Sequence, residues 1–192
     1  DLPEPDAAAR AHSERVAAHL RAAIAAGAGH IPFSRYMELA LYAPGLGYYA
    51  AGAQKLGAAG DFVTAPEMTP LFATALATQL AAVLAAGERR EIVELGGGSG
   101  RLAADLLVAL ATHDALPSRY AILEVSPDLA QRQRATLARD VPAHLGRVAW
   151  ITSLPETIDG ALIANEVLDA VPVDLVARRG GRWFGRGVTW DD

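Results

Sequence analysis

Apolar residues at helical spacing mark the N-terminal part of the chain. Val16, Leu20 and Ile24 recur every four positions, which is the period of one face of an α-helix. Ser34 is a favourable N-cap for a second, shorter helix, and Thr69, followed by a proline, is a favourable start for a third. Helices are therefore predicted over residues 7–26, 35–42 and 69–86.

Beyond residue 88 short apolar runs alternate with helical stretches. Strands are predicted over residues 91–95, 120–125, 147–151 and 160–164, and helices over residues 101–112 and 127–139. This alternation indicates an α/β fold with a parallel sheet, in which ligands bind at the loops that follow the strands. An antiparallel hairpin over residues 173–177 and 183–189, around a Gly-Gly turn, is predicted to follow.

The first predicted strand leads into residues 96–100, which contain four glycines in five positions. Glycine permits a positive φ and lets a ligand approach the main chain where a Cβ would clash, whereas a plain tight turn needs only one glycine. The spacing differs from the dinucleotide pattern G-x-G-x-x-G, and a phosphate-binding lysine of the Walker type is absent. Glu94, Gly96, Gly98 and Gly100 instead form Glu-x-Gly-x-Gly-x-Gly, which resembles the first motif of class I S-adenosylmethionine-dependent methyltransferases.

A second candidate ligand residue is Glu124, at the end of the second predicted strand and 24 residues after Gly100. A carboxylate in this place can accept hydrogen bonds from both hydroxyl groups of a ribose. It fits NAD and S-adenosylmethionine equally, and an ordinary solvated strand-end glutamate is the alternative. Trp150 ends the third strand near the expected adenine position, although a core tryptophan is the commoner explanation.

Further motifs make the resemblance more specific than the glycine loop does. Residues 60–67 (GDFVTAPE), the glycine loop and residues 164–173 (ANEVLDAVPV) occur in this order, preceded by Tyr36-Met37 and by a Pro-Gly-Tyr-Tyr stretch at 44–49. Together they resemble the MidA family of methyltransferases over about residues 31–190. The resemblance implies S-adenosylmethionine as cofactor and an arginine acceptor on a protein substrate, with a respiratory complex I subunit as the candidate. It also implies a cytoplasmic location, or the mitochondrial matrix in a eukaryote.

The resemblance also implies a Rossmann-like class I methyltransferase fold, preceded by an N-terminal helical segment. A complete sheet of this kind has more strands than the four predicted here, and family members are longer. We therefore expect an N-terminal portion of such an enzyme, with the sheet incomplete at the C-terminus. The expected divisions are residues 1–88 (helical segment and cofactor-covering loop), 89–172 (partial core) and 173–192 (hairpin, the start of a substrate-side region).

The candidate catalytic residues Asn165, Glu166 and Asp169 follow the fourth predicted strand. The guanidinium of an arginine acceptor is protonated at neutral pH, and carboxylates that pair with it can orient it and take up the proton released. Glu166 and Asp169 are three positions apart and face the same way if a helical turn follows. The resemblance favours a catalytic role, and a capped helix start is the alternative.

Asp61, Thr64 and Glu67 are further candidates for cofactor binding. They lie in a long irregular segment rich in glycine, ahead of the helix that starts at Thr69, and such loops are often functional. We expect this segment to fold over the donor site, with Thr64 and Glu67 near the cofactor's amino-acid end. An arrangement that merely caps the next helix is the alternative.

Composition narrows the choice of partners. The chain has 192 residues, 52% of them apolar, a net charge of −5 and scattered basic residues, which argues against nucleic acid as the main partner. It has no cysteine, and its five histidines form no close ligand pair, so we expect no metal site.

The longest apolar stretch of the chain is shorter than the roughly 20 residues that cross a bilayer, so we expect no membrane insertion. The first ten residues do not resemble a signal peptide, and because an initiator Met is missing we expect a chain that has been trimmed or cut from a longer one. The oligomeric state is left open.

Two other functions compete with an active methyltransferase. The first is a non-catalytic module that binds cofactor or partner but lacks the acceptor-side walls of the complete enzyme. The second is an NAD-linked oxidoreductase, which is disfavoured because the third glycine of the dinucleotide spacing is missing.

Overall fold

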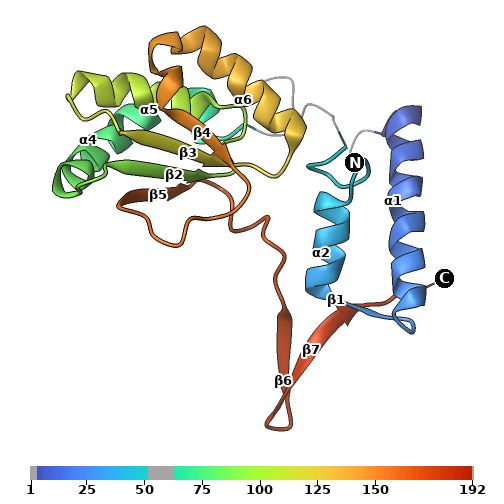
Figure 1. Cartoon of the computed structure of the whole chain (residues 1–192). Helices are drawn as coiled ribbons and strands as arrows, with labels where there is room; N and C mark the ends of the chain where they lie inside the picture. Colours follow the sequence, from blue (N-terminus) through green and yellow to red (C-terminus); the bar gives the residue numbers. More distant parts are fainter. Residues whose placement is uncertain (1–3, 52–62, 192) are drawn as a thin grey trace. The chain divides into compact units, whose positions relative to one another are not determined.

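The computed structural model describes residues 4–51 and 63–191, which form two compact units (Figure 1). The terminal unit comprises residues 1–53 and 169–192, and the sheet unit comprises residues 54–168. The predicted divisions at residues 88 and 172 differ from these bounds. The difference arises because helix α4 (Leu71–Ala86) packs with the sheet, while the hairpin pairs with a strand near the N-terminus.

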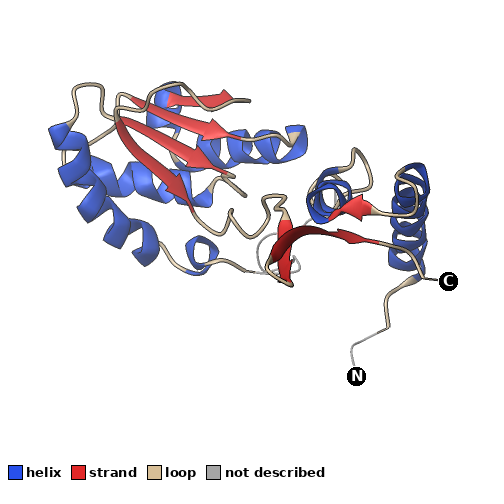
Figure 2. Cartoon of the chain, turned by 90° about the horizontal axis from the view of Figure 1, so that it is seen from below, coloured by secondary structure: helices blue, strands red, loops and turns tan. Residues whose placement is uncertain are grey.

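The sheet unit contains four parallel strands in the order β4-β3-β2-β5, which confirms the predicted α/β fold. The strands are β2 (Glu91–Leu95), β3 (Arg119–Leu123), β4 (Val148–Ile151) and β5 (Gly160–Ala164). The remaining elements are α3 (Ala65–Met68), α4, α5 (Arg101–Thr112), α6 (Pro127–Asp140) and the 3₁₀ helix η1 (Pro142–Arg147). Helices α4, α5 and α6 lie on the same side of the sheet (Figures 1 and 2). Because the four strands are parallel, they all end at the same edge of the sheet, and the loops after β2, β3 and β5 begin there.

The core of the sheet unit lies between these helices and the sheet. Buried leucines of α5 pack against Ile92, Tyr120 and Ile122 of the central strands. Helix α4 contributes small residues as well, and Ala73 and Ala77 are almost fully buried. Small side chains let α4 and α5 approach closely, so α4 is part of the core of this unit.

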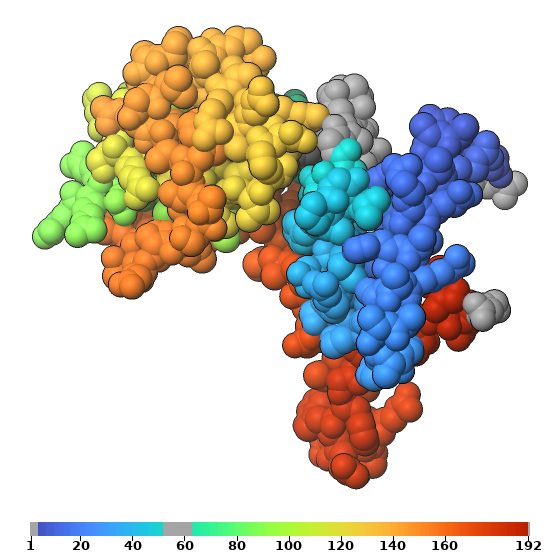
Figure 3. All heavy atoms as spheres, turned by 45° about the vertical axis from the view of Figure 1, so that its right-hand side comes forward, coloured from blue at the N-terminus to red at the C-terminus, as the bar shows by residue number. Residues whose placement is uncertain are grey.

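The terminal unit joins both ends of the described chain. Its elements are α1 (Ala7–Ala26), β1 (Ile31–Pro32), α2 (Phe33–Tyr42), β6 (Leu175–Arg179) and β7 (Arg182–Val188). Helices α1 and α2 pack side by side (Figure 3), and Leu20, Ile24, Ile31 and Leu39 form a small core with Val188. The strands form an antiparallel sheet in the order β1-β7-β6.

Several element ends differ from the prediction. The prediction that Ser34 caps the second helix was wrong, because α2 begins at Phe33 and the Ser34 hydroxyl donates a hydrogen bond to Asp174 instead. Strand β1 was missed, since two residues with a proline show no alternation, and η1 and α3 were missed as short helices in irregular sequence. The helical turn expected after β5 is absent, and residues 165–170 form a bend and a turn. None of the helices in residues 4–51 and 63–191 has both the length and the apolar character needed to cross a membrane.

Candidate cofactor site

The loop after β2 has the backbone shape that the sequence predicted. Gly96, Gly98 and Gly100 have φ angles of 61°, 53° and 85°, which lie in the left-handed region. A residue with a Cβ is strained in this region, so the loop needs glycine at all three positions. Gly100 is also the N-cap of α5, so the loop leads directly into the helix.

Two of the four glycines are also required by packing inside the protein. A Cβ at Gly97 would lie 2.8 Å from Cγ2 of Ile122 and 3.3 Å from Nε2 of Gln133. A Cβ at Gly100 would lie 3.0 Å from Cα of Gln133. The glycines therefore let the loop rest on β3 and α6, a reason that the sequence alone did not reveal.

The acidic residue of the motif, Glu94, points into the protein interior. Its side chain is only 2% exposed, and its Oε2 accepts a 2.8 Å hydrogen bond from the hydroxyl of Tyr120. Burial raises the pKa of Glu94 to about 7, the bond from Tyr120 opposes this shift, and the charge of Glu124 adds to it. The predicted contact of Glu94 with the cofactor stays a prediction.

Glu124 follows directly after β3 and is partly exposed. Its Oε1 accepts a hydrogen bond from the backbone N–H of Ser126 (2.8 Å), and its Oε2 accepts one from Nε2 of Gln133 (2.9 Å). Both bonds fix the orientation of the carboxylate. A carboxylate has about four lone-pair positions, so each oxygen of Glu124 keeps acceptor capacity for a diol.

Gln133 is the residue of this region that the sequence reasoning missed. It lies on α6 and is 0% exposed, and its Nε2 also donates to the carbonyl of Gly98 (3.1 Å). Its Oε1 accepts from Nε1 of Trp150 (2.9 Å). A signal existed in the pattern, because Ala130, Gln133 and Leu137 occupy the buried face of α6 and only Gln133 is polar.

Trp150 takes part in internal contacts at this edge. Besides the bond to Gln133, its ring has the guanidinium of Arg134 above it, 4.2 Å from the centroid. These contacts agree with the commoner explanation of Trp150 as a packed residue.

The segment around α3 touches the glycine loop. The Ser99 hydroxyl, within the loop, donates a hydrogen bond to Oε1 of Glu67 on α3. Thr64 is the N-cap residue of α3 and makes no side-chain capping bond. Asp61 lies outside the described residues. Of the three predicted residues ahead of Thr69, Glu67 is therefore joined to the loop, and its role toward a ligand stays a prediction.

The predicted acceptor-side residues follow β5. The side chain of Val167 lies beside the glycine loop, since a Cβ at Gly96 would be 3.2 Å from its Cγ2. Asn165 is partly buried, whereas Glu166 is exposed and has a left-handed φ of 51°, an uncommon conformation for a residue other than glycine. Asp169 belongs to the terminal unit, where its charge adds to burial in raising the pKa of Tyr49.

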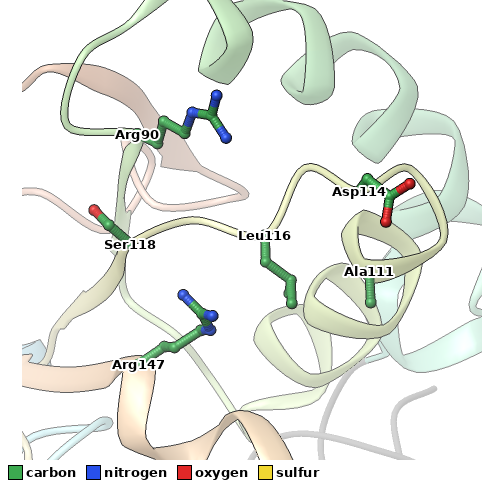
Figure 4. Close-up of a pocket in the computed structure, with 6 residues that line it drawn as sticks. All are labelled: Arg90, Ala111, Asp114, Leu116, Ser118 and Arg147. Carbon is green, nitrogen blue, oxygen red and sulfur yellow. The ribbon is translucent and has the colours of Figure 1, made fainter.

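A hollow of about 410 Å³ lies at the opposite edge of the sheet (Figure 4). Arg90, Ser118 and Arg147, which line it, come shortly before β2, β3 and β4, so it lies at the amino ends of the strands. Arg147 donates a 2.9 Å hydrogen bond to the carbonyl of Pro117. Ligands of open α/β sheets bind at the carboxyl ends, so this hollow is separate from the candidate cofactor site.

A parallel sheet with a bare glycine loop after one strand and an oriented carboxylate after the next defines a Rossmann-like fold of the class I methyltransferase type. Residues 71–192 match the family described as "Putative S-adenosyl-L-methionine-dependent methyltransferase", and the chain belongs to this family. The resemblance to the MidA methyltransferases is thereby confirmed.

Relatives and solved structures agree with this family. The mitochondrial protein arginine methyltransferase NDUFAF7 homologue of Caenorhabditis elegans is 32% identical over 177 residues, which cover 81% of this chain and 42% of that protein. The homologue of Drosophila melanogaster is 32% identical over 205 residues, covering 94% of this chain and 46% of that protein. A crystal structure from Burkholderia thailandensis with bound S-adenosyl-homocysteine is 51% identical, with a TM-score of 0.90, covering all of this chain and 51% of that one. The chain thus spans about half the length of the relatives it matches.

Proposed function

We propose that this chain is the cofactor-binding part of an S-adenosylmethionine-dependent protein arginine methyltransferase. The observation that carries the proposal is the arrangement of three left-handed glycines after β2 with an oriented carboxylate, Glu124, after β3. The neighbour from Burkholderia thailandensis, 51% identical, binds S-adenosyl-homocysteine, which supports the cofactor. The names of the NDUFAF7 relatives support an arginine on a protein as the acceptor.

The residues present fit such a cofactor. Gly96 and Gly98 have no side chains of their own, so the main chain can approach the ligand closely. Glu124 has acceptor capacity for the two ribose hydroxyls. Glu67 and Thr64 would lie toward the amino-acid end, with Glu67 attached to the loop through Ser99. S-adenosylmethionine, when bound, would supply an electrophilic methyl group. When the S–C bond breaks, its electron pair stays on the sulfur.

In the sheet unit, the acceptor side would be formed by Asn165 and Glu166, and the role of Asp169 stays a prediction from the sequence. A guanidinium nitrogen that gains a methyl group must lose a proton, and a carboxylate next to it can accept that proton. A carboxylate also orients the guanidinium by charge-assisted hydrogen bonds. Glu166 is exposed and has a strained backbone conformation, and it directly precedes Val167, whose side chain lies beside the loop. A subunit of respiratory complex I is the proposed protein substrate.

The first prediction concerns the glycine loop. Gly98→Val should weaken the binding of S-adenosyl-homocysteine by roughly 100-fold or more, because a β-branched residue is strained at a φ of 53° and narrows the loop. Isothermal titration calorimetry measures the affinity, and circular dichroism checks the fold. Gly146→Val is the matched control, since a Cβ there meets nothing within 4 Å and φ is not left-handed. A folded wild-type protein without saturable binding at millimolar ligand would refute the cofactor assignment.

The second prediction concerns the identity of the methyl acceptor, and it is tested with the full-length protein. Incubation with S-adenosylmethionine and arginine-containing complex I subunits, followed by mass spectrometry, should show methyl groups on arginine nitrogen. Glu166→Gln should reduce this transfer while leaving S-adenosyl-homocysteine affinity within about 2-fold, because the residue is assigned to the acceptor. Saturable cofactor binding without transfer to any arginine would favour the non-catalytic module.

A further inference from the structure

A fully buried amide connects four separate parts of the sheet unit. Gln133 has 0% exposure, and both of its polar side-chain atoms are hydrogen-bonded: Nε2 donates to the carbonyl of Gly98 and to Oε2 of Glu124, and Oε1 accepts from Nε1 of Trp150. The orientation of the amide is fixed by chemistry. The indole N–H can only donate, and the carbonyl and the carboxylate can only accept, so exchanging the oxygen and nitrogen of Gln133 would break every bond.

Packing holds this amide at the base of the loop. Gly97 lies so close that an added Cβ would be 3.3 Å from Nε2 of Gln133, and Gly100 lies against the backbone of the same residue. The loop after β2 therefore rests directly on Gln133. The glycine loop and the buried amide of Gln133 therefore depend on each other, because the loop can lie against Gln133 only where it has no side chains.

We propose that Gln133 is a positioning residue for the cofactor, a role that rests on the proposed function. Its Nε2 fixes Oε2 of Glu124, while the N–H of Ser126 fixes Oε1, so the carboxylate keeps one orientation with acceptor capacity for a ribose diol. The same nitrogen holds the carbonyl of Gly98. Since the peptide unit is planar and trans, the following N–H, that of Ser99, points to the opposite side, away from Gln133.

Only an amide satisfies these partners. A methionine would leave the Gly98 carbonyl, the Glu124 carboxylate and the Trp150 N–H without their bonds, at a cost typical of buried unpaired groups. A glutamate would place a second carboxylate against Glu124 and the Gly98 carbonyl. Its protonated form, however, has one O–H that can restore one of the two donated bonds.

The test compares Gln133→Glu with the wild type in calorimetric titrations with S-adenosyl-homocysteine at about pH 8 and about pH 6. At the higher pH the variant should bind about 10-fold or more weakly, and at the lower pH much of this loss should be recovered, because the new carboxyl group becomes protonated. Glu94, which also titrates near this range, is present in both proteins, so the ratio of the two affinities at each pH is compared. Gln131→Glu is the matched control, since it makes the same chemical change on an exposed position of α6.

A double-mutant cycle separates positioning from general destabilisation. Gln133→Met and Glu124→Gln should each weaken binding, and the loss of affinity in the double variant should be clearly smaller than the product of the two separate losses, because both changes act on the same carboxylate. Multiplication of the two separate losses would contradict the proposal. So would a Gln133→Glu variant that is folded and binds like the wild type at both pH values, or one whose loss is equal at both.

A ligand-free readout distinguishes this inference from the proposed function. In a Trp183→Phe/Trp190→Phe background Trp150 is the remaining tryptophan, and its emission should shift between Gln133 and Gln133→Glu as pH rises. If the wild type fails to bind S-adenosyl-homocysteine, the proposed function is wrong and the positioning role falls with it, whatever the emission shows. If the wild type binds and the emission and affinity of the variant do not change, only the inference about Gln133 is wrong.

Discussion

At the scale of single residues, the candidate site depends on groups held in unfavourable states by their surroundings. Glu166 has a left-handed backbone, and Glu94 is a carboxyl group buried against Tyr120. Such states are stable only where neighbouring contacts impose them. Left-handed backbone also occurs at the amino ends of the strands, at Arg90 and Asp114. The carboxyl edge differs because it combines the glycine loop with the oriented carboxylate of Glu124.

Glu94 should make the stability of the protein depend on pH. Its pKa is raised from 4.5 to about 7, so the folded state holds the proton more tightly than the unfolded state does. The resulting stabilisation is fully present below about pH 4.5 and is lost as pH rises through about 7. At one pKa unit per 1.36 kcal/mol, the free energy of unfolding should fall by on the order of 3 kcal/mol at most across this window. Glu94→Gln should remove that slope in urea titrations, and an unchanged slope would contradict the assignment.

At the scale of elements, α3 and α5 meet around the glycine loop. Ser99 joins the two, since its hydroxyl donates to Glu67 and its oxygen accepts from the N–H of Arg101 (3.3 Å) at the start of α5. Helix α3 has only one turn and would not be stable in isolation. Its position therefore depends on contacts of this kind.

Loss of the Ser99 hydroxyl should loosen α3 from the loop. Ser99→Ala should weaken S-adenosyl-homocysteine binding by about 3- to 10-fold and lower the unfolding free energy by about 1 kcal/mol, the usual value of one hydrogen bond. Ser118→Ala provides the control, because its hydroxyl bonds the carbonyl of Arg89 at the opposite edge of the sheet. An equal effect of both changes on affinity would show that the contact with Glu67 has no special role.

At the scale of the whole molecule, the chain forms two units with separate cores. Helix α4 shares the core of the sheet unit with α5, and β1 joins the hairpin in the terminal unit. The sheet unit contains the glycine loop, Glu124 and Gln133 together. Its packing should therefore determine the stability of the site.

Leu106 tests the contribution of this core. Its side chain is fully buried between α5 and the sheet, so Leu106→Ala should lower the unfolding free energy by about 2–5 kcal/mol. Val108→Ala, on the same helix but 52% exposed, should change it by less than about 0.5 kcal/mol. Guanidinium titrations measure both. A similar small change for the two variants would mean that α5 does not pack as described.

The order of elements and the main ligand motif could be predicted from the sequence. The bounds of α1, α5, β2 and β5 match the prediction, because their apolar periodicity is a local property of the chain. Positive φ angles after β2 were predicted from another local property, the four glycines in five positions. A glycine-rich loop between a strand and a helix is visible in neighbouring residues.

Only the tertiary structure decided which distant groups meet. Gln133 and Gly98 are 35 residues apart in the sequence, and Ser99 and Glu67 are 32 residues apart. No local sequence pattern can therefore predict either contact. A buried polar residue is stable only when its partners come from other elements, and those partners are fixed by how α6 and α3 pack at the sheet edge. The sequence alone determined that a bare loop and a strand-end acid exist. Folding determined that an internal amide holds them together.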